Sequence, residues 1–173
     1  IGTTPSYLEA RSWPVVSGSA FASSDVRSAT RVALIGKTAA DNLFGDEDPV
    51  GKTIRIRQSP FIILGTLAAK GQGMDGRDQD DTLLIPLTTA QNKLLGITHV
   101  NWINVSAVSE SQVEEAVNQI TELLRQRHRI QAGADDDFWL RNLQEVMAAQ
   151  EASSRVLALL LAAVASVSLL VGG

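Results

Sequence analysis

The sequence contains no cysteine and only two histidines among its 173 residues. Without cysteine the chain can form no disulfide and no thiolate metal site. His99 and His128 have no neighbour in the sequence that would complete a zinc site or a catalytic base. No G-x-S-x-G pattern occurs either, which excludes the nucleophile elbow of many hydrolases. We therefore expect no catalytic residue, no cofactor and no metal ion.

Clustered positive charge is also missing. The chain has 15 lysine and arginine residues against 19 aspartate and glutamate residues, which gives a net charge of -4. Because phosphate recognition needs clustered cations, we expect no nucleic-acid partner. Two Gly-Lys-Thr triplets begin at Gly36 and Gly51, but the glycine of a phosphate loop is replaced upstream by Arg31 and Asp46. We therefore expect no nucleotide site.

Two acidic runs, at 78–81 and 135–137, raise the question of calcium. Carboxylate oxygens suit this ion, but neither run has the central glycine and the terminal glutamate of the twelve-residue calcium loop. We expect both runs to be solvated charges in loops.

The longest apolar stretch, at 156–173, contains no charged residue and no amide. As a helix it would measure roughly 27 Å, close to the roughly 30 Å of a bilayer core. A buried core helix is the alternative, but such helices usually carry a polar stripe, which is absent here. We expect a piece of a membrane protein that stops partway through a membrane helix. Its transmembrane residues would be Val156, Leu157, Leu160, Leu161, Val164, Leu169, Leu170, Val171, Gly172 and Gly173.

The last helix is predicted to begin before this stretch, at the capping pattern Asn142-x-x-Glu145. No glycine or proline follows before Gly172, so we expect one helix of about 30 residues, roughly 45 Å long. Its first turns would stand outside the membrane as a rigid rod. Glu151 and Arg155 mark the expected boundary, because neither charge belongs in hydrocarbon. Residues 1 to about 150 would then lie outside the bilayer.

Residues 1–99 are predicted to form a small β-rich lobe. The first 30 residues show few periodic signals, although Trp13, Val16 and Phe21 are suited to packing. Strands are expected at 31–35, 53–57, 61–67 and 82–87, with Ser59-Pro60 forming a hairpin turn. Short helices are expected at 38–44 and 88–95. Residues 70–81 contain three glycines and no periodicity, so we expect a mobile loop.

Residues 100–142 follow a different pattern, typical of a β-α-β half-unit. The segment 101–107 alternates as a strand, and Phe138 and Leu140 indicate another. Between them, Ser111-x-x-Glu114 is typical of a capping box ahead of an amphipathic helix. This helix ends in cations, which oppose its dipole. Its apolar stripe comprises Val113, Ala116, Val117, Ile120, Leu123 and Leu124.

Several short motifs carry a resemblance to a known family. The chain opens with Gly2-x-x-Pro5-x-Tyr7, and VALIG follows at 32–36. The most specific stretch is L-F-G followed by D-P-V-G-K, and its motif residues are Leu43, Phe44, Gly45, Asp48, Pro49 and Gly51. The chain resembles the extracytoplasmic core domain and second membrane helix of MacB-like ABC transporter permeases. We expect Pro49 and Gly51 to shape a turn, with Pro49 at its second position.

The resemblance implies an α+β fold in three parts. Residues 1–99 would be a β-rich inserted lobe of a periplasmic domain, and residues 100–142 the second half of an α/β lobe. Residues 143–173 would be a stalk and a truncated transmembrane helix. The protein would lie in the bacterial inner membrane.

The resemblance also implies a function without catalysis in this chain. The permease would work as a homodimer with an ABC ATPase, either fused or separate, and with a periplasmic adaptor and an outer-membrane channel in some relatives. ATP hydrolysis in the cytoplasm would drive periplasmic motion and thereby export of a macrolide, peptide, toxin or lipoprotein. The alternative is a membrane-anchored extracytoplasmic sensor or scaffold without transport activity.

Overall fold

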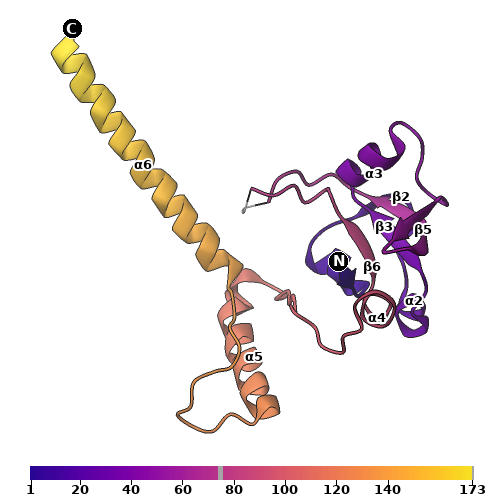
Figure 1. The fold of residues 1–173 in the computed structure, drawn as a ribbon. Coiled ribbons are helices and arrows are strands. Elements are labelled where there is room, and N and C mark those ends of the chain that lie inside the picture. The colour runs from indigo at the N-terminus through magenta and orange to yellow at the C-terminus, as the bar shows by residue number, and fades with distance from the viewer. Residues whose placement is uncertain (74–75, 173) are drawn as a thin grey trace. The chain divides into compact units, whose positions relative to one another are not determined.

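The structure is a computed structural model that describes residues 1–73 and 76–172 (Figure 1). Contacts divide the chain into two units, Ile1–Ser106 and Ala107–Gly173, and each is described by itself. The first unit contains a sheet. The second contains helices only, within the residues that the structure describes.

The described residues of the first unit form a six-stranded mixed sheet in the order β1-β6-β3-β5-β2, with β4 paired to β5. The strands β1 and β6, and likewise β3 and β5, run parallel, whereas the other pairs are antiparallel. The apolar strands β3 and β5 therefore occupy the centre. The strands are β1 (Gly2–Thr3), β2 (Val15–Gly18), β3 (Val32–Ile35), β4 (Thr53–Ile56), β5 (Ser59–Leu67) and β6 (Leu83–Pro86).

Helices cover both faces of this sheet. On β3, Leu34 packs on one face with Trp13 and Phe21, to which α1 and α2 add apolar side chains. The neighbouring side chains of Ala33 and Ile35 point to the other face, as strand alternation requires, and pack with η1 and α3. The helices are α1 (Ser6–Ala10), α2 (Ser23–Ser28), α3 (Lys37–Phe44), α4 (Leu87–Thr89) and the π-helical turn η1 (Ala90–Leu95).

The end of β6 is tied to α2 through two threonines. The hydroxyl of Thr88 donates to the carbonyl of Val26, and that of the buried Thr89 donates to the carbonyl of Thr30 at 2.7 Å. Figure 1 shows the resulting proximity of α2 and α4. These bonds satisfy hydroxyl groups that would otherwise be costly to bury.

The strands predicted at 31–35, 53–57, 61–67 and 82–87 and the short helices predicted at 38–44 and 88–95 are confirmed, but the predicted position of the hairpin turn is wrong. Arg57 and Gln58 form the turn, with φ of 45° and 68°. Ser59 and Pro60 belong to β5 and pair with β4. Positive φ at both central residues is the geometry of a hairpin turn whose twist matches its strands, and it does not require proline.

The first 30 residues contain more structure than their sequence suggested, namely β1, α1, β2 and α2. Trp13 and Phe21 are buried as expected, whereas Val16 is 66% exposed, so its predicted packing is wrong. Of these elements, β1 and α1 have only two and five residues, too few for a repeating pattern to appear.

The loop at 70–81 is organised by a buried carboxylate. Asp80 is 4% exposed and accepts hydrogen bonds from the amides of Lys70, at 2.8 and 3.0 Å, and Gly71, at 2.8 Å. Its own carbonyl accepts the amide of Ala39 at 3.2 Å. A bridge between Gln72 and Asp78 joins the two arms of the loop. The prediction of a solvated charge is therefore wrong for Asp80; Met74 and Asp75 lie outside the described residues.

The second unit comprises η2 (Glu110–Gln112), α5 (Val113–His128) and α6 (Leu143–Gly172). The capping box at Ser111 is not formed, because α5 begins after Gln112 without a side-chain cap. The strands predicted at 101–107 and near Phe138 are also absent from the described residues. Alternating side chains favour a strand, but its backbone also needs a neighbouring strand to accept and donate hydrogen bonds.

The second acidic run folds back on the cationic end of α5. Arg125 pairs with Asp136 and donates to the carbonyls of Gln131 and Ala134, at 3.1 and 3.0 Å. The Nδ1 atom of His128 lies 2.8 Å from a carboxylate oxygen of Asp137. Asp136 and Asp137 are exposed loop residues, as predicted, and each also lies against a side chain at the end of α5.

Substitution of Asp80 tests the role of its buried carboxylate. We expect Asp80→Asn to lower the free energy of unfolding by about 1–3 kcal/mol, because the amide group replaces an acceptor with a donor against backbone N–H groups. Urea denaturation would measure the loss. Asp81→Asn is the matched control, since Asp81 is exposed. An equal effect of the two substitutions would contradict the assignment.

Candidate functional site

The family motif begins where α3 ends. Gly45 caps the helix with φ of 60°. The ammonium group of Lys52 lies 5.1 Å from the ring centroid of Phe44 and pairs with Glu47. The hydrogen bond from Lys52 lowers the pKa of Glu47. Leu43, by contrast, is 59% exposed.

The rest of the motif forms a tight turn. The Asp48 carboxylate accepts the amide of Val50 at 3.0 Å, and the amide of Lys52 donates to the carbonyl of Pro49 at 3.0 Å. Pro49 is thus the first residue of the turn and not the second, as was predicted. Gly51 is the third, with φ of +81°, as a type II turn requires.

This turn is joined directly to the central strand β5. The amide of Gly51 donates to the carbonyl of Ile63 at 2.8 Å, and the amide of Ile63 returns a bond to the carbonyl of Lys52 at 2.9 Å. The bonds support a role for the motif in backbone shape, since they leave its polar groups engaged within the protein.

Helix α6 is unbroken over 30 residues, as expected. The side chains of Val156, Leu157, Leu160, Leu161 and Val164 are between 56% and 66% exposed. The structure does not describe the side chains of Leu169, Leu170 and Val171, the exposure of Gly172, or any part of Gly173. Among the described residues, no helix is both long and apolar enough to cross a membrane.

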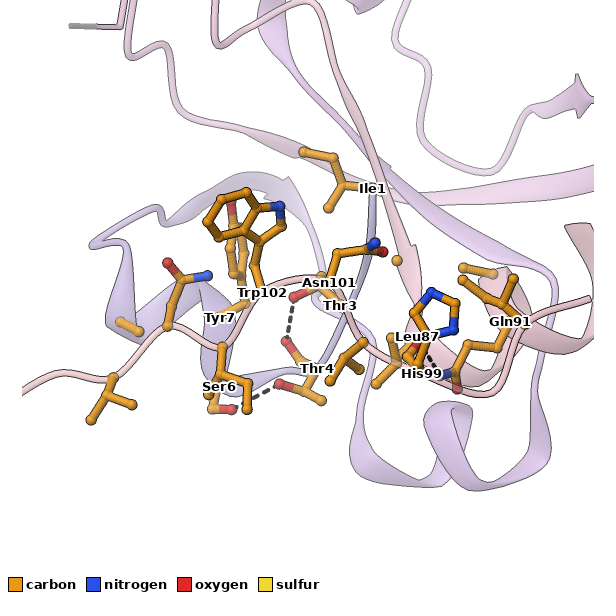
Figure 2. Close-up of a pocket in the computed structure, with 18 of the residues that line it drawn as sticks. Ile1, Thr3, Thr4, Ser6, Tyr7, Leu87, Gln91, His99, Asn101 and Trp102 are labelled. Carbon is orange, nitrogen blue, oxygen red and sulfur yellow. Dashed lines mark hydrogen bonds between the residues drawn. The ribbon is translucent and has the colours of Figure 1, made fainter. Parts of the chain in front are cut away.

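The first unit also contains a broad trough, of about 1200 Å³, that the sequence did not reveal (Figure 2). One part of its lining comes from β1 and α1, and another from η1 and the segment 99–106. Figure 2 shows Tyr7 and Trp102 toward one side and Gln91 with His99 toward the other. The apolar residues at 100–105 are exposed in the structure. In the sequence their alternation predicts a strand, so it gives no indication of the trough.

The polar groups of the trough are mostly hydroxyls and amides. The hydroxyls of Thr4 and Ser6 lie 3.0 Å apart, and the side-chain amide of Gln91 donates to the carbonyl of His99 at 3.1 Å. In the described part of the chain, no three His, Cys, Asp or Glu residues are grouped to hold a metal. The lining of the trough also includes the titratable side chains of Glu9 and His99.

The fold is that of an α+β domain with a mixed sheet, followed in the sequence by one long helix. Residues 1–123 match the model of the MacB-like periplasmic core domain, and the chain belongs to this family. The predicted resemblance and the α+β class are thereby confirmed.

Two curated relatives cover nearly the whole chain. The macrolide export ATP-binding/permease protein MacB of Rhodospirillum rubrum is 41% identical over 99% of this chain. The pyoverdine export ATP-binding/permease protein PvdT of Pseudomonas aeruginosa is 34% identical, also over 99%. The chain spans only 26% and 25% of their respective lengths.

Two solved structures share the fold. The periplasmic region of MacB from Actinobacillus actinomycetemcomitans has a TM-score of 0.67 at 24% identity, over 87% of this chain and 64% of that one. The extracellular domain of the transporter YknZ from Gram-positive bacteria has a TM-score of 0.60 at 21% identity, over 82% and 68%.

The motif turn predicts a backbone penalty at Gly51. A Cβ atom there would meet nothing within 4 Å, so the cost arises from φ of +81° alone. We expect Gly51→Val to lower the free energy of unfolding by about 1–2 kcal/mol, and Gly51→Asn to cost less, because asparagine tolerates this region. Thermal unfolding would measure both. Lost export with an unchanged melting temperature would instead indicate a functional contact.

The geometry at Gly36 predicts that this chain alone binds no nucleotide. The amide of Ala39 near the start of α3 is already bonded to Asp80, whose carbonyl oxygen lies 2.2 Å from an added Cβ at Gly36. A phosphate would need these helix-start amides to be open. Calorimetric titration with ATP should give no saturable heat. A saturable isotherm would overturn the prediction.

Proposed function

We propose that this chain is the extracytoplasmic part of an ABC exporter permease and couples cytoplasmic ATP hydrolysis to periplasmic motion that drives export. The observation that carries the proposal is the unbroken helix α6, Leu143–Gly172, in a member of the MacB-like periplasmic core domain family. An uninterrupted helix transmits a displacement along its axis, whereas a flexible joint would dissipate it.

The surface of α6 supports a membrane location for its C-terminal half. Burying one leucine or valine side chain is worth roughly 1.5–3 kcal/mol. Leu157, Leu160 and Leu161 are each at least 60% exposed, so the helix gains from an apolar environment. We place the transmembrane segment at 156–173 in a bacterial inner membrane, with residues 1 to about 150 on the periplasmic side.

The curated relatives are described as ATP-binding/permease proteins, which supports an ABC ATPase as the partner. We extend the proposal to a homodimeric transporter with an adaptor and an outer-membrane channel. The relatives named for macrolide and pyoverdine export support a substrate in the range of macrolides, peptides, toxins or lipoproteins. Within the chain, we assign 1–99 to the inserted lobe, 100–142 to the second half of the α/β lobe and 143–173 to the stalk and membrane helix.

The rigid-link function predicts the effect of an insertion in α6. Two glycines inserted between Ala152 and Ser153 should leave the first unit folded but uncouple ATP hydrolysis from export, because glycine favours the helix by about 1 kcal/mol less than alanine per residue. ATPase activity and export would be measured on the complete transporter in membranes.

Two alanines inserted at the same point are the matched control. They give the same change in length and helical phase but keep the helix stiff. Export that falls equally with both insertions would implicate length or phase instead of stiffness. Wild-type export by the glycine variant would contradict the rigid link, and a complete protein without substrate-dependent export would favour the sensor or scaffold alternative.

A further inference from the structure

The base of the loop at 70–81 is held against the end of α1 by side chains that the proposed export function does not use. These side chains belong to Arg11, Trp13, Lys70, Gln79 and Asp80, which we call the hairpin clamp. Figure 1 shows the two arms of this loop leaving the sheet side by side. All five residues belong to the first unit.

Three contacts of the clamp connect the segment after α1 to the loop. The ammonium group of Lys70 donates to the carbonyl of Arg11 and lies 5.2 Å from the ring centroid of Trp13. The indole N–H of Trp13 donates to the carbonyl of Ala68 at 2.6 Å. The guanidinium of Arg11 donates to the side-chain oxygen of Gln79 at 2.9 Å.

The clamp contains two basic side chains, those of Arg11 and Lys70, and one acidic side chain, that of Asp80. The Asp80 carboxylate is engaged by the backbone amides of Lys70 and Gly71. Burial lowers the pKa of Lys70, the nearby Arg11 charge lowers it further, and Asp80 opposes both effects. The Nε atom of Arg11 is buried and has no hydrogen-bond partner among the described residues. The clamp therefore holds through the Asp80 carboxylate, through neutral oxygen acceptors and through the ring of Trp13.

The clamp reaches the trough through α1, which has only five residues and none that is buried. The amide of Arg11 donates to the carbonyl of Tyr7 at 3.0 Å, and that of Trp13 donates to the carbonyl of Leu8 at 2.8 Å. Tyr7 and Glu9 line the trough. Helix α1 thus contributes Tyr7 and Glu9 to the lining of the trough, and Arg11, the residue directly after it, is bonded to Lys70 and Gln79 of the clamp.

We propose that the hairpin clamp couples the position of the loop at 70–81 to the width of the trough. A partner or a substrate that displaces the arms of the loop would release Lys70 and Gln79 from Arg11. The end of α1 would then lose its tie to the loop, and the trough wall at Tyr7 and Glu9 would shift as far as the packing of Tyr7 and Leu8 on the core allows. The coupling is a conformational device within the first unit and does not depend on which substrate is exported.

The absence of cysteine from the 173 residues makes this proposal measurable. Glu9→Cys and His99→Cys place spin labels at two exposed residues that line the trough. In the full chain, the distance distribution between the labels reports the width of the trough. Amide hydrogen exchange at Gly71 and Gln79 reports the stability of the loop base.

The clamp variant is Lys70→Met with Arg11→Gln, and its control is Lys93→Met with Arg27→Gln, at two exposed positions. We expect the clamp variant to broaden the label distances and to speed exchange at Gly71 and Gln79 about fivefold or more, since each lost hydrogen bond is worth about 1 kcal/mol. The control should change neither quantity. If the clamp variant does not fold, Gln79→Ala removes only the partner of Arg11 and serves in its place.

Two results would overturn the proposal. Unchanged exchange at the loop base would show that these side chains do not clamp it. Faster exchange with an unchanged distance distribution would show that the loop is clamped but that the clamp does not set the width of the trough. A loss of export in either case would leave the proposed function to be judged by the insertion experiment.

Discussion

The first unit depends on one buried charge. Asp80 lies shortly before β6 and bonds to backbone groups from two other regions, to Lys70 and Gly71 after the end of β5 and to Ala39 near the start of α3. A buried carboxylate is tolerated only when its oxygens are satisfied, and here the backbone supplies the donors. The same closeness explains Gly36, since any side chain there would collide with the carbonyl of Asp80. The loop at 70–81 therefore does more than connect β5 to β6, because Asp80 bonds the two ends of this loop to each other and to α3.

The motif from Leu43 to Gly51, which carries the family resemblance, is also explained by contacts between neighbouring residues. Gly45 ends α3, Asp48 caps the turn that follows, and Gly51 supplies the positive φ that this turn needs before the chain enters β4. These residues specify how a helix is followed by a strand, and the geometry is the same whatever the domain binds. The bonds of this turn all lie within the protein, so the motif by itself carries no information about the substrate.

Sequence patterns predicted the elements whose side chains alternate or repeat over a sufficient length, such as β4, β5, α3 and α5. They missed β1 and α1, because two and five residues are too few for a period. They also misjudged Asp80, because the amides that its carboxylate accepts lie ten and nine residues earlier in the chain and cannot be recognised from local composition. The trough was missed for a related reason. Its lining joins β1 with a segment about 100 residues later, and only the folded chain brings them together.

The two units satisfy their apolar groups in different ways. The first unit buries three clusters of side chains on the two faces of its sheet, so its core is internal. In the second, α5 contains no buried residue and the described leucines of α6 from Leu157 to Leu161 are at least 60% exposed. Since an amphipathic helix gains most of its stability from packing its apolar face, the second unit has to obtain that stability from an apolar environment or another surface. A part of the chain that draws its stability from its surroundings also responds to them. This dependence is the physical basis of the proposal that the second unit transmits motion.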